Sequence, residues 1–210
     1  MTAKDFVKHI SWIGHDGFQI KGSKTVYFDP FEISGGEPAD ILCVTHDHYD
    51  HLSIDDIAKI KKEDTVIVTE KNSAKSLEGD VRVVIPGDTL EIEGVKISVV
   101  PSYNTNKKFH PKDKGYLGFI VEMDGVKVYH AGDTDVIPEM KEIETDIALL
   151  PVSGTYVMTA QEAAEAAMLI RAELVIPMHF GSIVGSNSDA ETFKKLLEGK
   201  KAVVVLQKRN

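Results

Sequence analysis

The stretch His46-Asp47-His48-Tyr49-Asp50-His51 follows directly after a short apolar run, Ile41–Val44, that is typical of a strand buried on both faces. In an extended or turning segment, His46 and His48 can point the same way and bind one metal ion. Asp50 and His51 lie around the bend and can face a second ion. A solvated polar loop is the competing interpretation, but three His and two Asp after an apolar strand favour a metal site.

The composition is that of an ordinary globular chain of 210 residues, and it excludes several classes of protein. The formal charge of −9 leaves no basic face for a nucleic acid backbone, so we expect no nucleic acid partner. The single cysteine, Cys43, excludes an intramolecular disulfide. We find neither an apolar signal segment in residues 1–10 nor a membrane span, which would need ~20 apolar residues. We therefore expect one domain over residues 1–210, cytoplasmic and without a membrane partner.

Short apolar or alternating segments between turn residues predict a series of strands. In chain order these are His9–Ile13, Phe18–Lys21, Thr25–Phe28, Ile41–Val44, Val66–Thr69, Arg82–Ile85, Leu90–Ile92, Val95–Val100, Tyr116–Met123, Val126–His130, Ile147–Leu150, Leu174–Pro177 and Ala202–Leu206. Asp124-Gly125 predicts a tight hairpin turn.

Helices are expected at Ser53–Lys62, near Asn72–Leu77, at Ala160–Ile170 and from Ser188 to about Leu197. Capping-box patterns, Thr159 with Glu162 and Ser188 with Glu191, mark the last two. Strands dominate the first half and return after the later helices, which favours two sheets with helices outside.

The His-x-His-x-Asp-His string resembles the signature of the metallo-β-lactamase superfamily of metal-dependent hydrolases. Asp29, at the end of the third expected strand, matches the family's first acidic position. Asp133 in His130–Thr134 matches its bridging aspartate, and His179 in Pro177–Gly181 matches its last ligand position. The resemblance implies an α/β fold, the four-layer αβ/βα sandwich of that family.

By resemblance, His46 and His48 hold a first metal, while Asp50, His51 and His179 hold a second. Asp133 bridges the two ions, and Asp29 supports the loop from behind without binding metal. We therefore expect one or two divalent cations, Zn²⁺ first, with Mn²⁺, Ni²⁺ or Fe²⁺ as alternatives. The family also implies a catalytic role for Asp50, which would hold or accept a proton.

One departure from the family pattern concerns the third motif, where a histidine is usual and this chain has Asn104. Either His110, six residues on, takes that place as a ligand, or the first site is incomplete. His15 lies in a Trp-x-Gly-His stretch that resembles one branch of the superfamily, which includes ascorbate-6-phosphate lactonase-like and phosphodiesterase-like members. This likeness predicts that His15 lines the site.

A polar loop, residues 102–115, follows the strand that ends before Asn104, and loops of this kind are often lids or binding loops. Its four lysines and one aspartate favour an anionic substrate, with Lys108 as a site-lining residue. Residues 152–158, which include Tyr156, are a candidate for the opposite wall.

The expected function is metal-dependent hydrolysis, in which a metal-bound hydroxide attacks a small, anionic ester, lactone or phosphodiester. A nuclease of the same superfamily and a non-catalytic metal-binding module are the alternatives. The resemblance also allows a homo-oligomer.

Overall fold

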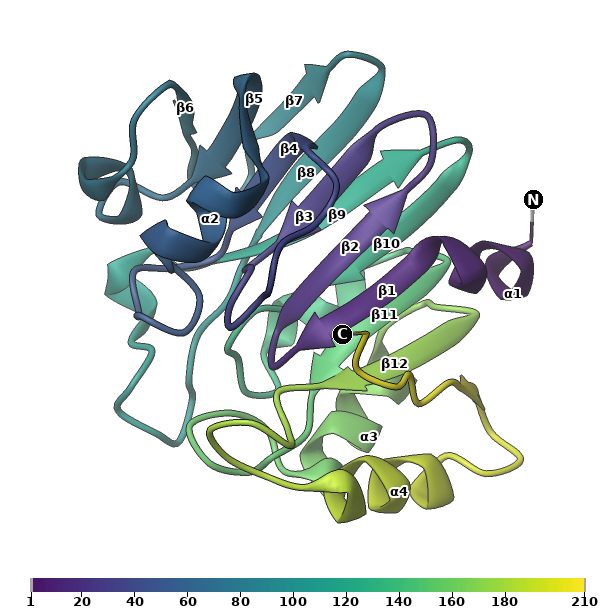
Figure 1. The fold of residues 1–210 in the computed structure, drawn as a ribbon. Coiled ribbons are helices and arrows are strands. Elements are labelled where there is room, and N and C mark those ends of the chain that lie inside the picture. The colour runs from purple at the N-terminus through teal and green to yellow at the C-terminus, as the bar shows by residue number, and fades with distance from the viewer. Residues whose placement is uncertain (1, 210) are drawn as a thin grey trace.

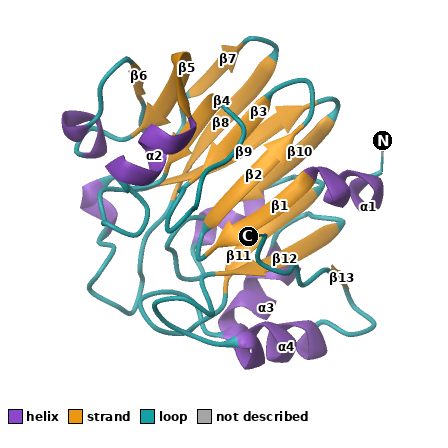
Figure 2. Ribbon diagram, in the orientation of Figure 1, coloured by secondary structure: helices purple, strands orange, loops and turns teal. Residues whose placement is uncertain are grey.

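The computed structural model describes residues 2–209, which form two β-sheets packed face to face (Figures 1 and 2). The first sheet has the order β1-β2-β3-β4-β5-β6 and the second the order β13-β12-β11-β10-β9-β8-β7. The strands of the first are β1 (Ile10–Gly14), β2 (Gly17–Lys21), β3 (Thr25–Phe28), β4 (Ala39–Val44), β5 (Lys61–Thr69) and β6 (Asp80–Val83). Those of the second are β7 (Thr89–Ile92), β8 (Val95–Pro101), β9 (Leu117–Met123), β10 (Val126–His130), β11 (Ile147–Pro151), β12 (Leu174–Met178) and β13 (Ala202–Val203).

Helices cover the outer faces of both sheets, which gives the four layers expected for an αβ/βα sandwich (Figure 1). The α-helices are α1 (Ala3–Phe6), α2 (Ile54–Ile60), α3 (Ala160–Leu169) and α4 (Asn187–Leu196), with 3-10 turns at Val7–His9, Ser73–Ser76, Lys112–Lys114 and Pro138–Glu142. Ile57 and Ile60 of α2 pack against Leu42 on the outer face of the first sheet. Helices α3 and α4 contact each other and lie against β11 and β12. Among residues 2–209, no helix has the length and apolar composition needed to cross a bilayer.

Large apolar side chains fill the space between the two sheets. Phe18 and Phe28 of the first sheet are fully buried, and so is Phe119 of the second. The ring centroids of Phe28 and Phe119 lie 6.4 Å apart. Because alternate residues of each strand face this layer, the period-2 pattern of the sequence is enough to locate most strands.

The parallel strands of both sheets bring their carboxyl ends to one edge of the sandwich. Strands β3 to β6 run parallel in the first sheet, as do β10 to β13 in the second. The predicted hairpin joins β9 to β10, with Asp124 and Gly125 at φ 54° and 76°. It makes β9 antiparallel to β10, so the loop after β10 opens at the edge that the loops after β4, β11 and β12 share.

The structure departs from the sequence prediction at several element ends. Helix α4 is capped by Ser186 with Asp189, not by Ser188 with Glu191, because the chain is still extended at Ser186. Residues 61–62, expected as helix, open β5, since Lys61 pairs with Ala39. Strand β13 is shorter than expected, because the tail crosses to the first sheet, where Arg209 N donates to Trp12 O. The short helix α1 was not predicted.

Candidate metal centre

A first group of three imidazoles gathers at the shared strand edge. His46 and His48 follow β4, and His110 comes from the loop after β8. His48 Nδ1 lies 3.0 Å from His46 Nε2 and 3.3 Å from His110 Nε2. One ligand atom of each histidine falls within 4.8 Å of the others, a separation that one ion can span. The loop after β8 therefore brings His110 next to His46 and His48. This is the position at which the family usually has the histidine of the third motif, where this chain has Asn104.

A second group forms beside the first and shares Asp133 with it. His51 Nε2 lies 3.5 Å from Asp133 Oδ1, and His179 Nε2 lies 3.3 Å from Asp133 Oδ2. The same Oδ2 lies 3.2 Å from His110 Nε2, so the carboxylate of Asp133 touches both groups. Asp50 Oδ2 lies 3.9 Å from His51 Nε2. The structure thus brings together all seven residues expected to bind metal.

Asp29 fixes the ring orientation of two histidines from behind the loop after β4. His51 Nδ1 donates to Asp29 Oδ2 over 2.8 Å. The Thr45 hydroxyl donates to the same oxygen over 2.6 Å and so accepts from His46 Nδ1, which lies 2.9 Å away. With the proton on Nδ1, each neutral ring keeps its lone pair on Nε2, which faces the centre.

Two other polar residues fix His110 and His179 in the same way. His110 Nδ1 donates to Asn104 Oδ1 over 3.1 Å. His179 Nδ1 donates over 2.9 Å to Ser153 Oγ, whose own proton goes to the carbonyl of Thr155. Side chains that hold a histidine through its second nitrogen are typical of metal sites, since they set its tautomer and angle.

The centre contains buried polar atoms that make no hydrogen bond within residues 2–209. They include His51 Nε2, His179 Nε2 and Asp133 Oδ1. Leaving such atoms unpaired is costly, because a buried polar atom loses its bonds to water. Two imidazole nitrogens and a carboxylate oxygen are ligands for a transition-metal cation, so the donor set fits one or two divalent ions.

Burial and neighbouring charge shift the pKa values of the central groups in opposite directions. Burial would raise the pKa of Asp133, but His179 and His51 hold it well below its usual range. Burial would lower the pKa of His51, but Asp133 and Asp29 raise it well above its usual range, so a cation at Nε2 would displace a proton there. Burial lowers the pKa of His46 well below normal, which favours the neutral ring that a metal requires.

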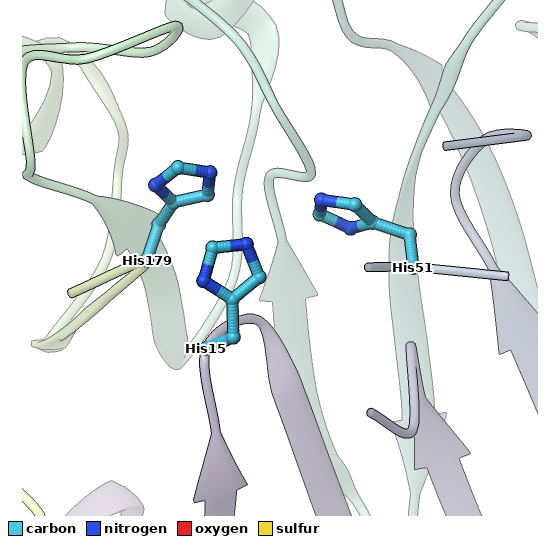
Figure 3. A group of neighbouring side chains, drawn as sticks. All are labelled: His15, His51 and His179. Atoms are coloured by element: carbon cyan, nitrogen blue, oxygen red, sulfur yellow. The ribbon is translucent and has the colours of Figure 1, made fainter. Parts of the chain in front are cut away.

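His15 lies against the second group, as the sequence predicts. It stands in the β1–β2 turn at φ 49°, and its Nε2 lies 3.1 Å from Asp50 Oδ2. Figure 3 shows the ring beside those of His51 and His179, and one ligand atom from each of the three falls within 4.8 Å of the others. The indole of Trp12 and the backbone N–H of His179 both donate to His15 O, which holds the turn at the centre.

The sequence analysis missed Asp16, the next residue of this turn. Its side chain is fully buried, and neither carboxylate oxygen has a hydrogen-bond partner among residues 2–209. A carboxylate oxygen of Asp16 lies within 4.8 Å of ligand atoms of Asp133 and His179. Burial, together with the charge of Asp133, raises the pKa of Asp16 well above its usual range. Its position next to His15, in a turn expected to approach the metals, was the available signal.

An open cleft of about 410 Å³ leads from solvent to the centre. Its lining comprises Asp47, His48, Tyr49, Asp50, Phe109, His110, Asp133, Tyr156 and Ile183. Tyr156 supplies a wall from residues 152–158, as expected.

Two residues expected to line the site lie elsewhere. Lys108 is exposed and is not part of the cleft lining, because the next two residues, Phe109 and His110, occupy that wall. Asn104 lies behind His110, where its side chain holds the ring and the backbone N–H of His110. Two other lysines of the loop are engaged outside the cleft, Lys107 by Asp135 at 2.5 Å and Lys112 by Glu139 at 2.9 Å.

Two facing sheets with helices outside, and a His/Asp centre at one strand edge, define a metallo-β-lactamase-like fold. The family model described as "Beta-lactamase superfamily domain" matches residues 9–179, and the chain belongs to this superfamily. The curated relatives that match it over nearly their full length are named UPF0173 metal-dependent hydrolases. The protein from Methanoculleus marisnigri is 36% identical over 90% of this chain and 88% of its own length. That from Thermococcus onnurineus is 33% identical over 94% and 96%.

Solved structures agree with this assignment. A protein from Parabacteroides distasonis, classed as a metal-dependent hydrolase, superimposes with a TM-score of 0.84 at 35% identity, over 94% of this chain and 93% of its own. One from Thermotoga maritima, classed as a Zn-dependent hydrolase of the metallo-β-lactamase superfamily, gives 0.66 at 28% identity, over 94% and 97%. The chain is therefore a metal-dependent hydrolase of this superfamily.

Proposed function

We propose that the chain hydrolyses a small ester, lactone or phosphodiester with one or two divalent cations held by the two His/Asp groups. His46, His48 and His110 would hold the first ion; Asp50, His51 and His179 would hold the second; Asp133 would contact both. The observation that carries the proposal is the hydrogen bonding of four buried rings through Nδ1. His46, His51, His110 and His179 each donate through Nδ1 and turn Nε2 toward the centre.

Such cations lower the pKa of a coordinated water and stabilise negative charge that develops on the substrate oxygen. The chain's own residues would then orient the substrate and move the proton. Asp50 lines the cleft and is partly exposed, so its carboxylate can reach both the centre and a substrate. Burial would raise the pKa of Asp50, but its hydrogen bond with His15 and the charge of His51 lower it. Asp50 is therefore ionised at neutral pH and able to accept a proton, with His15 as its positioning partner.

Zinc is the cation that we propose first. Five imidazole nitrogens and two carboxylates suit Zn²⁺, and Mn²⁺, Ni²⁺ and Fe²⁺ accept similar donors. The Thermotoga maritima relative, classed as Zn-dependent, supports the same choice.

Exposed lysines of the loop would attract an anionic substrate from a distance. They would not bind it inside the cleft, because no lysine is among the described lining residues. Lys108 and Lys114 are exposed on the loop that carries the cleft residues Phe109 and His110. Their charge would raise the encounter rate in low salt and lose this effect as salt is added.

Elemental analysis combined with a panel of lactones, carboxylic esters and phosphodiesters tests the proposal. We expect bound zinc or a related metal, hydrolysis of at least one class, and loss of both after treatment with a chelator. His48→Ala and His110→Ala should each lower metal content and turnover, whereas His9→Ala, outside the centre, should keep both. Equal metal content in all four proteins would refute the assignment of the first group.

A further inference from the structure

Half of the large hydrophobic side chains exposed among residues 2–209 surround one cleft, the one above the metal centre. Eight such side chains are exposed, and four of them line this cleft: Tyr49, Phe109, Tyr156 and Ile183. Single apolar residues at a surface are ordinary, but a cluster at the mouth of a site is typical of a binding surface. We refer to these four side chains as the apolar rim.

Three of the four rim residues come from loops that also supply the buried centre. Tyr49 stands between His48 and Asp50, and Phe109 directly precedes His110. Phe109 is 53% exposed while His110 is 1% exposed. Of these two neighbouring side chains, one therefore faces solvent and the other faces the centre. Ile183 follows His179 by four residues. Because the same loops carry both sets, the rim lies next to the His/Asp groups.

Contacts within the rim hold part of it in place. The rings of Phe109 and Tyr156 meet edge to face, with their centroids 4.5 Å apart. The backbone carbonyl of Tyr156 accepts a hydrogen bond from Asn104 Nδ2, and Asn104 also holds His110. An aromatic pair tied to a residue behind the centre is preorganised, which lowers the entropy lost when a ligand binds.

The charges at the cleft also favour an apolar ligand group over an acidic one. The charged residues of the lining are Asp47, Asp50 and Asp133, and neither lysine nor arginine is among the described lining residues. A carboxylate or phosphate far from the metals would therefore find no cation to pair with. An aromatic or branched apolar group would bury rim surface that is otherwise exposed to water.

We propose that the apolar rim binds an aromatic or similarly bulky apolar group of the substrate, next to the bond that is hydrolysed. This inference rests on the proposed function, since the rim orients a substrate whose reacting group lies on the His/Asp groups. The substrate class is then an ester, lactone or phosphodiester with an apolar arm, and not a small polyanion.

Calorimetric titration of the metal-loaded protein with phenylphosphonate and methylphosphonate tests the rim without needing turnover. Both carry the same oxyanion for the metal centre and differ in the apolar group. We expect the phenyl compound to bind at least about tenfold tighter, because its ring is buried on the rim. Phe109→Ser and Ile183→Ser should each reduce that ratio several-fold. Met168→Ser removes a side chain that is also 53% exposed, on α3 away from the cleft, and should retain the ratio.

The outcomes separate the inference from the proposed function. Equal affinities for the two phosphonates would overturn the inference and leave the proposed function standing. Failure of both to bind metal-loaded protein would overturn both. A ratio lost equally in Met168→Ser would also overturn the inference. So would a dimer that dissociates on Phe109→Ser in sedimentation runs, because the rim would then be an interface between copies.

Discussion

The two halves of the metal centre are built from different chemistry. The first group, His46, His48 and His110, consists of imidazoles, and His48 borders the open cleft. The side chains that bond directly to His46 and His110 are the neutral Thr45 and Asn104. The second group, Asp50, His51 and His179, contains a carboxylate and is backed by others: Asp29 bonds to His51, and Asp16 lies within reach of His179.

This difference predicts unequal affinities for a cation. Negative charge close to a partly buried site strengthens cation binding, since the interaction is poorly screened there. We therefore expect the second group to fill first when metal is limiting. The first group, with neutral ligands and one face toward solvent, should exchange its ion more readily. Asp133, which touches both groups, is the one ligand whose loss should remove the distinction.

The largest effect is expected for Asp133→Ala, which breaks both halves at once. Without this carboxylate two divalent cations would repel each other with no shared anion between them. We expect less than one metal equivalent per chain and hydrolysis reduced by about a thousandfold or more. Elemental analysis and kcat measurement check this, with circular dichroism to show that the fold is intact. A folded variant that keeps two equivalents would show that the halves are independent.

A smaller effect, confined to the first group, is expected for Asn104→Ala. Asn104 contacts the proposed metal ligand His110 from behind, through its ring and its backbone N–H. Loss of such support typically costs 10–100-fold in metal affinity. Competition with a chromogenic chelator should show the weaker site weakened by about that factor and the tighter site unchanged.

Asn106→Ala is the matched control for that variant. Asn106 lies in the same loop, but its side chain is exposed and bonds to Glu162. It should leave both affinities as in the unaltered protein. Equal weakening in Asn104→Ala and Asn106→Ala would mean that the loop as a whole, and not the bond to His110, sets the affinity of the first group.

The parts that sequence could predict are those encoded by local pattern. Period-2 alternation located most strands to within a residue or two, and Thr159 with Glu162 caps α3 as expected. The His46–His51 motif predicted candidate ligands for both halves, because its residues are adjacent in the chain. The layered fold and the positions of Asp133 and His179 came from family resemblance and not from periodicity.

The parts that sequence could not predict depend on the paths of loops. His110 reaches the centre because Asn104 N–H bonds to its carbonyl and Asn104 Oδ1 to its ring, which no spacing rule encodes. Lysine charges in the same loop pointed to Lys108, but the side chain that borders the cleft is the apolar Phe109. Aspartate is common in exposed turns, so the sequence gives no sign that Asp16 is buried. Only the packing of the folded chain shows it.

The smallest effect is expected for Asp16, whose buried carboxylate adds negative charge to the second half only. In metal-free protein the pKa of Asp16 is raised in the folded state, so its ionised form opposes folding. This cost is absent below the unfolded pKa, near 4, and grows as pH rises toward the folded pKa. Asp16→Asn should therefore stabilise the metal-free protein at pH 7 to 8 by about 1–3 kcal/mol. That raises Tm by about 2–4 °C per kcal/mol.

The advantage of Asp16→Asn should vanish below about pH 3, where Asp16 is protonated in both the folded and the unfolded state. It should also shrink or reverse when metal is added, because cations beside His179 and Asp133 would offset the charge of Asp16. Thermal melts of both proteins, with and without zinc across this pH range, measure the difference. A gap that stays constant with pH would show that Asp16 carries no buried charge, and the second half would then owe its tighter binding to Asp50 and Asp29 alone.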